Sequence, residues 1–271
     1  MLAPSFRGGF GTVYQVRQVR SGALFAMKCP NDSSLVKTDA QLHEMAALAA
    51  LGEHPHVVSL ITVTVEDGLP VFFMPWAQGG KLRDWIRKGV LTQQCESDHE
   101  AGCRLIDVGI QIARGLEHAH ERGLVNADVK PSNVLVKERL EGWEGGERWG
   151  WGPTVMVADF GLSTECEPGG SDGVGGYTPG YAAPEQIQRQ AVTEQTDVWS
   201  VGIVLLELVS VGKWDVQAAR LWSGEAAVRA MEGLVSWLPL GVGEQVVGLG
   251  GKCLEEEPSV RIKMAEIGRA S

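Results

Sequence analysis

Residues Leu124 to Val136 read LVNADVKPSNVLV, and the rest of the chain can be organised around this stretch. The acid Asp128 is followed two residues later by the base Lys130, and the amide Asn133 lies three residues beyond that. The apolar run Val134 to Val136 then predicts a short buried strand. A loop with these three polar groups, placed directly before a strand, can hold a phosphate, a metal ion and a hydroxyl close together.

Length and composition narrow the class of protein. The chain has 271 residues, enough for a large core and for one two-lobed domain. Its 24 basic and 34 acidic side chains give a net charge of −10. This balance argues against nucleic acid as the main partner, because phosphate backbones need clustered Lys and Arg. Five scattered cysteines without a C-x-x-C pair favour a reducing compartment over a disulfide framework or a zinc site.

No stretch predicts a signal peptide or a membrane span. Residues Met1 to Gln15 lack an apolar core of signal-peptide length. The most apolar stretch, Val198 to Val211, is too short to span a bilayer and contains Glu207. We interpret it as a buried helix and expect a soluble, cytoplasmic protein.

The opening stretch resembles the catalytic loop of protein kinases, H-R-D-x-K-x-x-N, with Asn126 and Ala127 in place of His and Arg. The resemblance implies one kinase domain over residues 1–271 with an α+β, two-lobed fold. Residues 1–74 would form a small antiparallel β lobe with one main helix, its first strand missing or reduced to Met1–Ser5. A hinge at 75–80 would lead into a larger, mostly helical lobe at 81–271.

The glycine-rich run from Phe6 to Val13 resembles the family's G-x-G-x-x-G-x-V loop. Gly8, Gly11 and Val13 match this pattern, Gly9 lies inside it, and Phe6 replaces the first glycine. Glycines allow backbone N–H groups to approach phosphate oxygens closely, so the resemblance implies a nucleotide-binding loop. An ordinary hairpin turn is the alternative.

The apolar run Leu24 to Lys28 predicts a strand that ends in a lysine, and it resembles the family's V-A-I-K strand. This resemblance makes Ala26 a nucleotide-binding residue and Lys28 the phosphate-binding lysine. Residues 35–51 have helical composition, and Glu44 is the carboxylate in the middle of that helix. We expect Glu44 to pair with Lys28; a solvated helix face is the alternative. The apolar residues of this helix recur on one face: Leu42, Met45 and Leu48.

Two strands are predicted next, at Val57–Val65 and Leu69–Met74, joined by a turn at residues 66–68. The run MPWAQGGKL at residues 74–82 then resembles the kinase hinge and the start of the following helix. The resemblance implies nucleotide contacts for residues of the hinge and of the strand after the catalytic loop: Met74 as gatekeeper, the Pro75 carbonyl, the Ala77 backbone, and Leu135.

A long helix is predicted before the catalytic loop, ending near Gly123 as a C-cap. The polar segment Cys95–Cys103 leads into it. His118 and His120 are two residues apart and face different ways, so packing is favoured over a metal site. The helix has one apolar stripe: Leu105, Val108, Ile112, Leu116 and Ala119.

The run Ala158 to Gly161, ADFG, follows the strand Val155–Val157 and places Asp159 31 residues after Asp128. It resembles the kinase D-F-G element, so Asp159 and Asn133 would be the hard oxygen ligands of Mg²⁺ bound with ATP. Residues 137–153, between the two strands, contain five glycines and three tryptophans. We interpret them as an insertion that is either a flexible connection or a protein-docking surface.

Residues 162–180 are glycine-rich and polar, include Ser171, and resemble an activation segment. The run YTPGYAAPE at residues 177–185 resembles the segment that receives a peptide substrate, in which Thr178 contacts the catalytic acid and base. Two further roles implied by the resemblance are structural. Asp197 would brace the catalytic loop, and Arg261 would pair with buried Glu185, which would be unstable alone.

The resemblance implies an enzyme that transfers the γ-phosphoryl group of Mg–ATP to a Ser or Thr hydroxyl of a protein substrate. Asp128 would orient the hydroxyl and accept its proton, and Lys130 would neutralise the transferring phosphoryl group. The alternative is a pseudokinase, a nucleotide-binding or scaffold module, suggested by the changes at Phe6, Asn126 and Ala127. A structural solenoid is disfavoured because no internal repeat is visible.

Ala127 also bears on regulation. In many kinases the Arg before the catalytic Asp pairs with a phosphate on the activation segment, and an alanine cannot do so. The sequence therefore predicts an activity that does not depend on phosphorylation at Ser163, Thr164 or Ser171.

Overall fold

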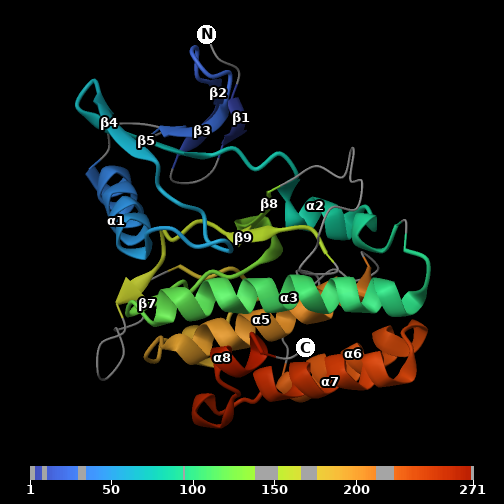
Figure 1. The fold of residues 1–271 in the computed structure, drawn as a ribbon. Coiled ribbons are helices and arrows are strands. Elements are labelled where there is room, and N and C mark those ends of the chain that lie inside the picture. Colours follow the sequence, from blue (N-terminus) through green and yellow to red (C-terminus); the bar gives the residue numbers. More distant parts are fainter. Residues whose placement is uncertain are drawn as a thin grey trace.

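The computed structural model describes residues 4–7, 11–29, 35–93, 95–137, 152–165, 176–211 and 223–269. These residues form a five-stranded antiparallel sheet with one long helix, followed by a larger and mostly helical part. Figure 1 shows the sheet at the top and α3, α5, α6, α7 and α8 at the bottom, with β8 and β9 between them. The α+β, two-lobed architecture expected from the sequence is confirmed.

The sheet of the small lobe has the strand order β1-β2-β3-β5-β4. β1 reaches Arg7, beyond the Met1–Ser5 limit that the sequence suggested, because Phe6 and Arg7 pair with Val13 and Thr12 of β2. The strands are β1 (Pro4–Arg7), β2 (Thr12–Arg17), β3 (Leu24–Cys29), β4 (Thr62–Glu66) and β5 (Leu69–Pro75).

β4 begins at Thr62, five residues after the predicted start at Val57. Val57 forms a parallel bridge with Val157 instead, and the Val58 N–H donates to the Val157 carbonyl at 2.9 Å. The prediction of one strand over Val57–Val65 was wrong because these two buried valines pair with the strand before Asp159. They thereby connect the two lobes.

Helix α1 spans Leu35–Leu51, as predicted, and its buried face matches the predicted one only in part. Leu42 is 41% exposed, whereas Leu48 and Leu51 are each 1% exposed. Glu44 lies on this buried side at 2% exposure. Of the predicted stripe, Leu48 is therefore buried and Leu42 is not, and the inward face also contains a carboxylate that needs a partner.

The large lobe is built around α5, which is buried over almost its whole length. No helix among the described residues is both long and apolar enough to cross a membrane. The α-helices of the large lobe are α2 (Leu82–Arg87), α3 (Asp98–His120), α4 (Pro184–Ile187), α5 (Glu194–Ser210), α6 (Gly224–Leu234), α7 (Leu240–Cys253) and α8 (Met264–Ile267). Its 3-10 helices are η1 (Val90–Thr92), η2 (Pro131–Asn133), η3 (Val235–Trp237) and η4 (Pro258–Val260).

Helix α3 begins at Asp98, inside the segment Cys95–Cys103 that the sequence suggested as a lead-in. The Ser97 hydroxyl caps the helix by accepting the Glu100 N–H at 3.2 Å. The cap explains why polar residues with no apolar period nevertheless form the first turns.

The structure has two small sheets besides the main one, and Figure 1 shows β8 and β9 between the main sheet and α3. One has the order β6-β8-β9, in which β8 directly follows the catalytic-loop stretch and β9 precedes Asp159. Because β8 pairs with β9, the catalytic loop before β8 and Asp159 after β9 lie at neighbouring ends of the two strands. The strands are β6 (Gly80–Lys81), β8 (Val134–Val136) and β9 (Val155–Val157), with β7 (Leu124–Val125) and β10 (Thr164–Glu165) in the other sheet.

Candidate active site

The Asp128 carboxylate is the centre of a dense polar cluster in the loop between β7 and β8. The Lys130 ammonium donates to Asp128 Oδ2 at 2.6 Å, and the Asn133 amide donates to the same oxygen at 3.0 Å. The Thr178 hydroxyl donates to Asp128 Oδ1 at 2.5 Å. Three donors from two segments therefore hold one carboxylate in a fixed orientation, as a general base requires.

Lys130 also joins the loop to the segment that carries Thr178. Its ammonium donates to Thr178 Oγ1 at 2.6 Å in addition to its contact with Asp128. The Lys130 side chain is 19% exposed and that of Asp128 is 9% exposed. This ion pair is therefore shielded from bulk water. A charge that is shielded in this way acts more strongly on a bound anion than it would in water.

The backbone of the loop is held by Asp197 at the start of α5. Its fully buried carboxylate accepts the N–H groups of Asn126 and Ala127, each at 2.9 Å. Ala127 has a φ of +62°, a left-handed conformation that an alanine adopts only when its surroundings impose it. His120 of α3 lies at 2.8 Å from the same carboxylate.

Two residues that sequence reasoning left without a role also hold this loop. The Gln186 amide of α4 donates to the Ala127 carbonyl at 2.9 Å. Asn126 is fully buried, accepts the Asp128 N–H at 3.1 Å and donates to the Asp159 carbonyl at 3.3 Å. Asn126, which looks like a mismatch in the sequence, thus links the catalytic loop to the element after β9.

Lys28 at the end of β3 and Glu44 of α1 form a buried ion pair. Burial raises the pKa of the Glu44 carboxyl; the Lys28 charge lowers that pKa, and the nearby Asp159 raises it. The attraction of Lys28 is what keeps a carboxylate in this apolar position. Lys28 and Asp159 thus both act on the charge of Glu44.

Asp159 and Asn133 are suited to hold Mg²⁺. The Asn133 amide nitrogen donates to the Asp128 carbonyl and to its carboxylate, each at 3.0 Å, which leaves the amide oxygen as an acceptor. Asp159 has a φ of +61°, and the residue before it, Ala158, donates its N–H to the Asn133 carbonyl at 2.8 Å. One carboxylate and one amide oxygen are the hard ligands that Mg²⁺ prefers. No larger His, Cys, Asp or Glu cluster occurs in the described residues.

Most of the predicted nucleotide-side residues gather between the lobes. Met74 and Leu135 pack against one small apolar cluster that contains Ala77, and Ala26 pairs with Met74 between β3 and β5. Gly11 is buried directly before β2, and Val13 is half-buried in it. Gly8, Gly9 and Ser171 lie outside the described residues, as does most of the segment 137–153.

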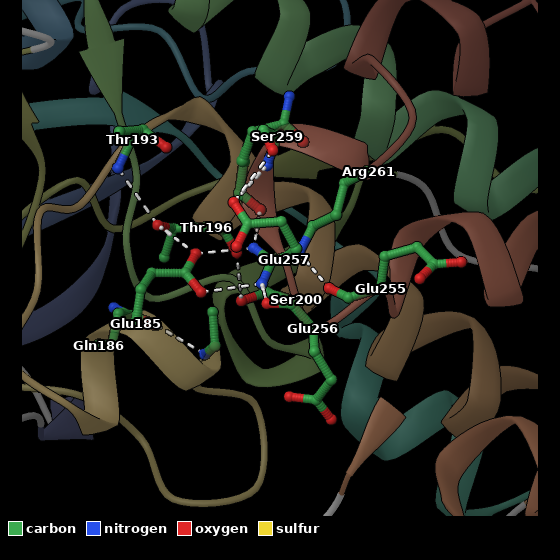
Figure 2. Close-up of polar contacts among 12 residues, drawn as sticks. Glu185, Gln186, Thr193, Thr196, Ser200, Glu255, Glu256, Glu257, Ser259 and Arg261 are labelled. Carbon is green, nitrogen blue, oxygen red and sulfur yellow. Dashed lines mark hydrogen bonds and ion pairs between the residues drawn. The ribbon is translucent and has the colours of Figure 1, made fainter. Parts of the chain in front are cut away.

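The predicted pair of Glu185 and Arg261 is present, and it ties the start of α4 to the end of the chain (Figure 2). The Arg261 guanidinium donates to both Glu185 oxygens, at 2.7 and 2.9 Å. It also donates to the carbonyls of Gln195 at 2.8 Å and Glu255 at 2.7 Å. Such a fork with complete hydrogen bonding can hold a buried charge.

A contact between α1 and the segment after β9 could not be found from the sequence. His43 Nε2 lies 2.5 Å from the Ser163 carbonyl, and the Ser163 hydroxyl donates to the Phe160 carbonyl at 2.7 Å. Ser163 is 5% exposed. Nothing in the local pattern of either residue indicates this contact, because the two are 120 positions apart.

The family comparison was made once this geometry was known. The model of the protein kinase domain family matches residues 7–269, nearly the whole chain. The chain belongs to the protein kinase domain family.

Two rice proteins (Oryza sativa subsp. japonica) are among its relatives. CBL-interacting protein kinase 28 is 28% identical over 210 residues, which cover 75% of this chain and 43% of that protein. CBL-interacting protein kinase 26 is 26% identical over 273 residues, covering 98% of this chain and 50% of that protein. The chain therefore spans about half the length of the curated relatives it matches.

Proposed function

We propose that this chain is a protein kinase that transfers the γ-phosphoryl group of ATP to Ser or Thr hydroxyls of a protein substrate. The observation that carries the proposal is the Asp128 cluster, in which Lys130 and Thr178 lock the carboxylate at 2.5–2.6 Å. A structural ion pair would need neither the Asn133 amide nor the braced left-handed Ala127. The D-x-K-P-x-N run around Lys130 favours Ser and Thr over Tyr as acceptors.

Each residue then has a distinct chemical role. Asp128 orients the acceptor hydroxyl and takes its proton as the new P–O bond forms. Lys130 neutralises negative charge on the transferring phosphoryl group, and Lys28, oriented by Glu44, holds the α- and β-phosphates. Mg²⁺, when held by Asn133 and Asp159, would shield the phosphate oxygens. Positioning and electrostatics supply most of the rate in this arrangement.

A transfer assay with radiolabelled ATP on generic Ser/Thr substrates tests the proposal. The parent chain should transfer phosphate in the presence of Mg²⁺, and Asp128→Asn should lower the rate by at least about 10²-fold, the usual contribution of a general base. Asp67→Asn is the matched control, because Asp67 lies in the β4–β5 turn at a φ of +50° that asparagine also tolerates. This variant should keep the parent rate.

A second measurement separates an active enzyme from a pseudokinase. Mg–ATP should raise the Tm of both the parent and Asp128→Asn, because the nucleotide contacts remain in that variant. A rise in Tm without any phosphate transfer by the parent would favour the pseudokinase. If the parent showed no phosphate transfer and no rise in Tm with Mg–ATP, nucleotide binding itself would be contradicted.

We infer further that activity does not depend on phosphorylation of Ser163, Thr164 or Ser171. Ala127 offers no cation for a phosphate, and the Ser163 hydroxyl is already engaged inside the protein. Treatment with a phosphatase should leave the transfer rate unchanged. A large loss of activity after treatment would contradict this inference.

Two expectations from the sequence complete the proposal. The tryptophan-rich segment 137–153 is a candidate docking surface for a protein partner, and its deletion should weaken binding to that partner while generic peptides are still phosphorylated. The acidic composition and scattered cysteines favour a cytoplasmic location; fractionation of cells that express the chain would test it.

A further inference from the structure

The side chain of His43 connects helix α1 to the segment that follows Asp159. Its Nε2 atom lies 2.5 Å from the Ser163 carbonyl oxygen and 3.2 Å from the Ser163 hydroxyl oxygen. His43 is exposed on α1, whereas the next residue, Glu44, is buried and pairs with Lys28. A histidine on the surface therefore joins the two lobes directly beside the buried ion pair of the site.

The hydrogen bonds of Ser163 decide which group donates in this contact. The Ser163 hydroxyl donates to the Phe160 carbonyl at 2.7 Å, so its oxygen is left to accept. The Ser163 carbonyl oxygen has no proton to give and can only accept. His43 Nε2 must therefore be protonated, and it donates to both oxygens of Ser163.

The acceptor that His43 meets is held in place by a closed turn. The Ser163 N–H donates to the Phe160 carbonyl at 3.1 Å, in addition to the bond from the hydroxyl. The Phe160 side chain is fully buried in the main core. Asp159 directly precedes this turn. A contact with Ser163 is therefore a contact with the rigid element that carries the metal-binding carboxylate.

The same turn is joined to the catalytic loop on its other side. Thr164, the residue after Ser163, pairs with Val125 in the ladder between β10 and β7. Val125 directly precedes Asn126, the first residue of the catalytic loop that the structure places around Asp128. The position of Ser163 is thus fixed relative to the catalytic loop, and His43 transmits that position to α1.

A second histidine holds the far end of α1. His118 Nε2 of α3 lies 2.8 Å from the Leu51 carbonyl, at the last residue of the helix. Apolar burial of Leu48 and Leu51 holds α1 against the core, but such packing is not directional. The rotation of α1 about its axis needs a directional contact further along the helix. His43, about two turns before Leu51, supplies one.

We propose that His43 is a positioning residue for phosphate transfer, whose hydrogen bond to Ser163 holds α1 in the rotation at which Glu44 meets Lys28. The proposal rests on the kinase activity proposed above and names a residue that sets the geometry of that site. The contact requires no phosphate on the segment after β9, in keeping with Ala127, which offers no cation to bind one. His43 acts through Glu44 and touches neither nucleotide nor substrate.

Two substitutions at this position test the donor. His43→Ala removes it without weakening the helix, because alanine is the best helix former. His43→Gln keeps an N–H donor at a similar reach. Loss of one hydrogen bond should lower kcat about five- to tenfold in His43→Ala, and His43→Gln should stay within about twofold of the parent. KM for a generic Ser peptide should be unchanged in both, because His43 does not touch the peptide.

Leu42→Ala is the matched control. Leu42 directly precedes His43, is 41% exposed and is changed to the same residue, so this variant should keep the parent kcat. Equal losses of kcat in His43→Ala and Leu42→Ala would overturn the proposal. Equal losses in His43→Ala and His43→Gln would overturn it as well, because a donor would then be irrelevant.

Amide hydrogen exchange without nucleotide separates this proposal from the kinase activity. In His43→Ala, exchange should become faster in α1 and in residues 160–165 and stay unchanged in α7. Faster exchange in α7 as well would indicate a general loss of stability and overturn the positioning role.

The two measurements together distinguish the two proposals. If the parent transfers phosphate and His43→Ala matches it in kcat and in exchange, the positioning role is overturned and the kinase activity stands. If the parent transfers no phosphate but exchange rises in α1 and in residues 160–165 of His43→Ala, the kinase activity is overturned. His43 would then keep its role in orienting the Lys28–Glu44 pair.

Discussion

Glu44 is 2% exposed, and its nearest cation, Lys28, comes from a different element. Asp197 is fully buried and receives two backbone N–H groups from the catalytic loop. Each of these carboxylates would be expensive to bury alone, so the residues of the site stabilise one another in pairs. Function and stability are therefore coupled at single positions, and the two can be separated only by paired substitutions.

The Lys28–Glu44 pair allows such a separation. Lys28→Met should lower the free energy of unfolding by about 3–5 kcal/mol, because Glu44 loses the charge that offsets its burial. The double variant Lys28→Met/Glu44→Leu should recover most of that loss in urea denaturation. Neither the single nor the double variant should catalyse phosphate transfer. A double variant as unstable as the single one would show that Glu44 is not what Lys28 stabilises.

The histidine contact between α3 and the residues after α1 makes stability depend on pH. His54 stacks on His118 with ring centroids 4.3 Å apart, and burial, then the His118, His56 and Arg122 charges, lower the pKa of His54 from 6.5 to about 4. Between these values the unfolded chain binds more protons than the folded one, so stability should fall as the pH falls from 6.5 toward 4.

Unfolding experiments at several pH values test this dependence. His54→Gln should flatten the decline of Tm between pH 6.5 and 4, because the group that protonates only in the unfolded chain is gone. His99→Gln, at an exposed position early in α3, is the control and should change the profile less. Parallel profiles for the parent and His54→Gln would exclude His54 as the source.

At the scale of elements, α3 packs closely against the segment that precedes β4. Its Gly115 faces the backbone of His56, so a Cβ at this position would meet the His56 carbonyl and come within 3.3 Å of Val157 Cγ2. The segment around His56 precedes the valines that pair with β9. A close approach of backbones at Gly115 therefore fixes the distance between α3 and the strand before Asp159.

Replacement of this glycine should destabilise the fold although alanine is the better helix former. Gly115→Ala should lower the free energy of unfolding by about 1–3 kcal/mol through overpacking. Gly248→Ala in α7, where a Cβ meets nothing within 4 Å, should instead raise it by up to about 1 kcal/mol. Thermal unfolding of both variants tests the contrast; equal effects of the two would contradict the close approach.

At the scale of the whole molecule, Glu185 and Arg261 close the large lobe across 76 residues of sequence. Arg261→Met should cost about 3–5 kcal/mol of unfolding free energy, because Glu185 stays buried without its partner. Arg229→Met removes an exposed pair with Glu225 and should cost no more than about 1 kcal/mol. Denaturant titrations would show the difference, and similar losses for both variants would contradict a structural role for the buried fork.

The sequence predicted the parts of the molecule that local patterns encode. Motif order led to the two-lobed fold, and the spacing of motifs led to the contacts of Lys28 with Glu44 and of Glu185 with Arg261. In α1 the predicted apolar face was right at Leu48 and wrong at Leu42, because Glu44 takes part in the buried face and a carboxylate counts as polar in any periodicity.

Contacts between distant segments without a periodic signature were out of reach. The hydrogen bond from Gln186 to the Ala127 carbonyl and the contact of His43 with Ser163 join residues 59 and 120 positions apart. The bridge from Val57 to β9 was hidden because a valine run reads equally well as part of β4.

The two ends of the connection between β8 and β9 are held together by hydrogen bonds. The Lys137 N–H donates to the Thr154 carbonyl at 2.9 Å, and Gln111 of α3 binds Pro153 and Val155 at 3.1 and 2.9 Å. When the ends of a loop are fixed in this way, doubling its length costs only about 0.6 kcal/mol of closure entropy. Insertions and deletions at this point can therefore accumulate over generations almost without selection on folding, and new binding sequences can be sampled there while the phosphotransfer groups stay in place.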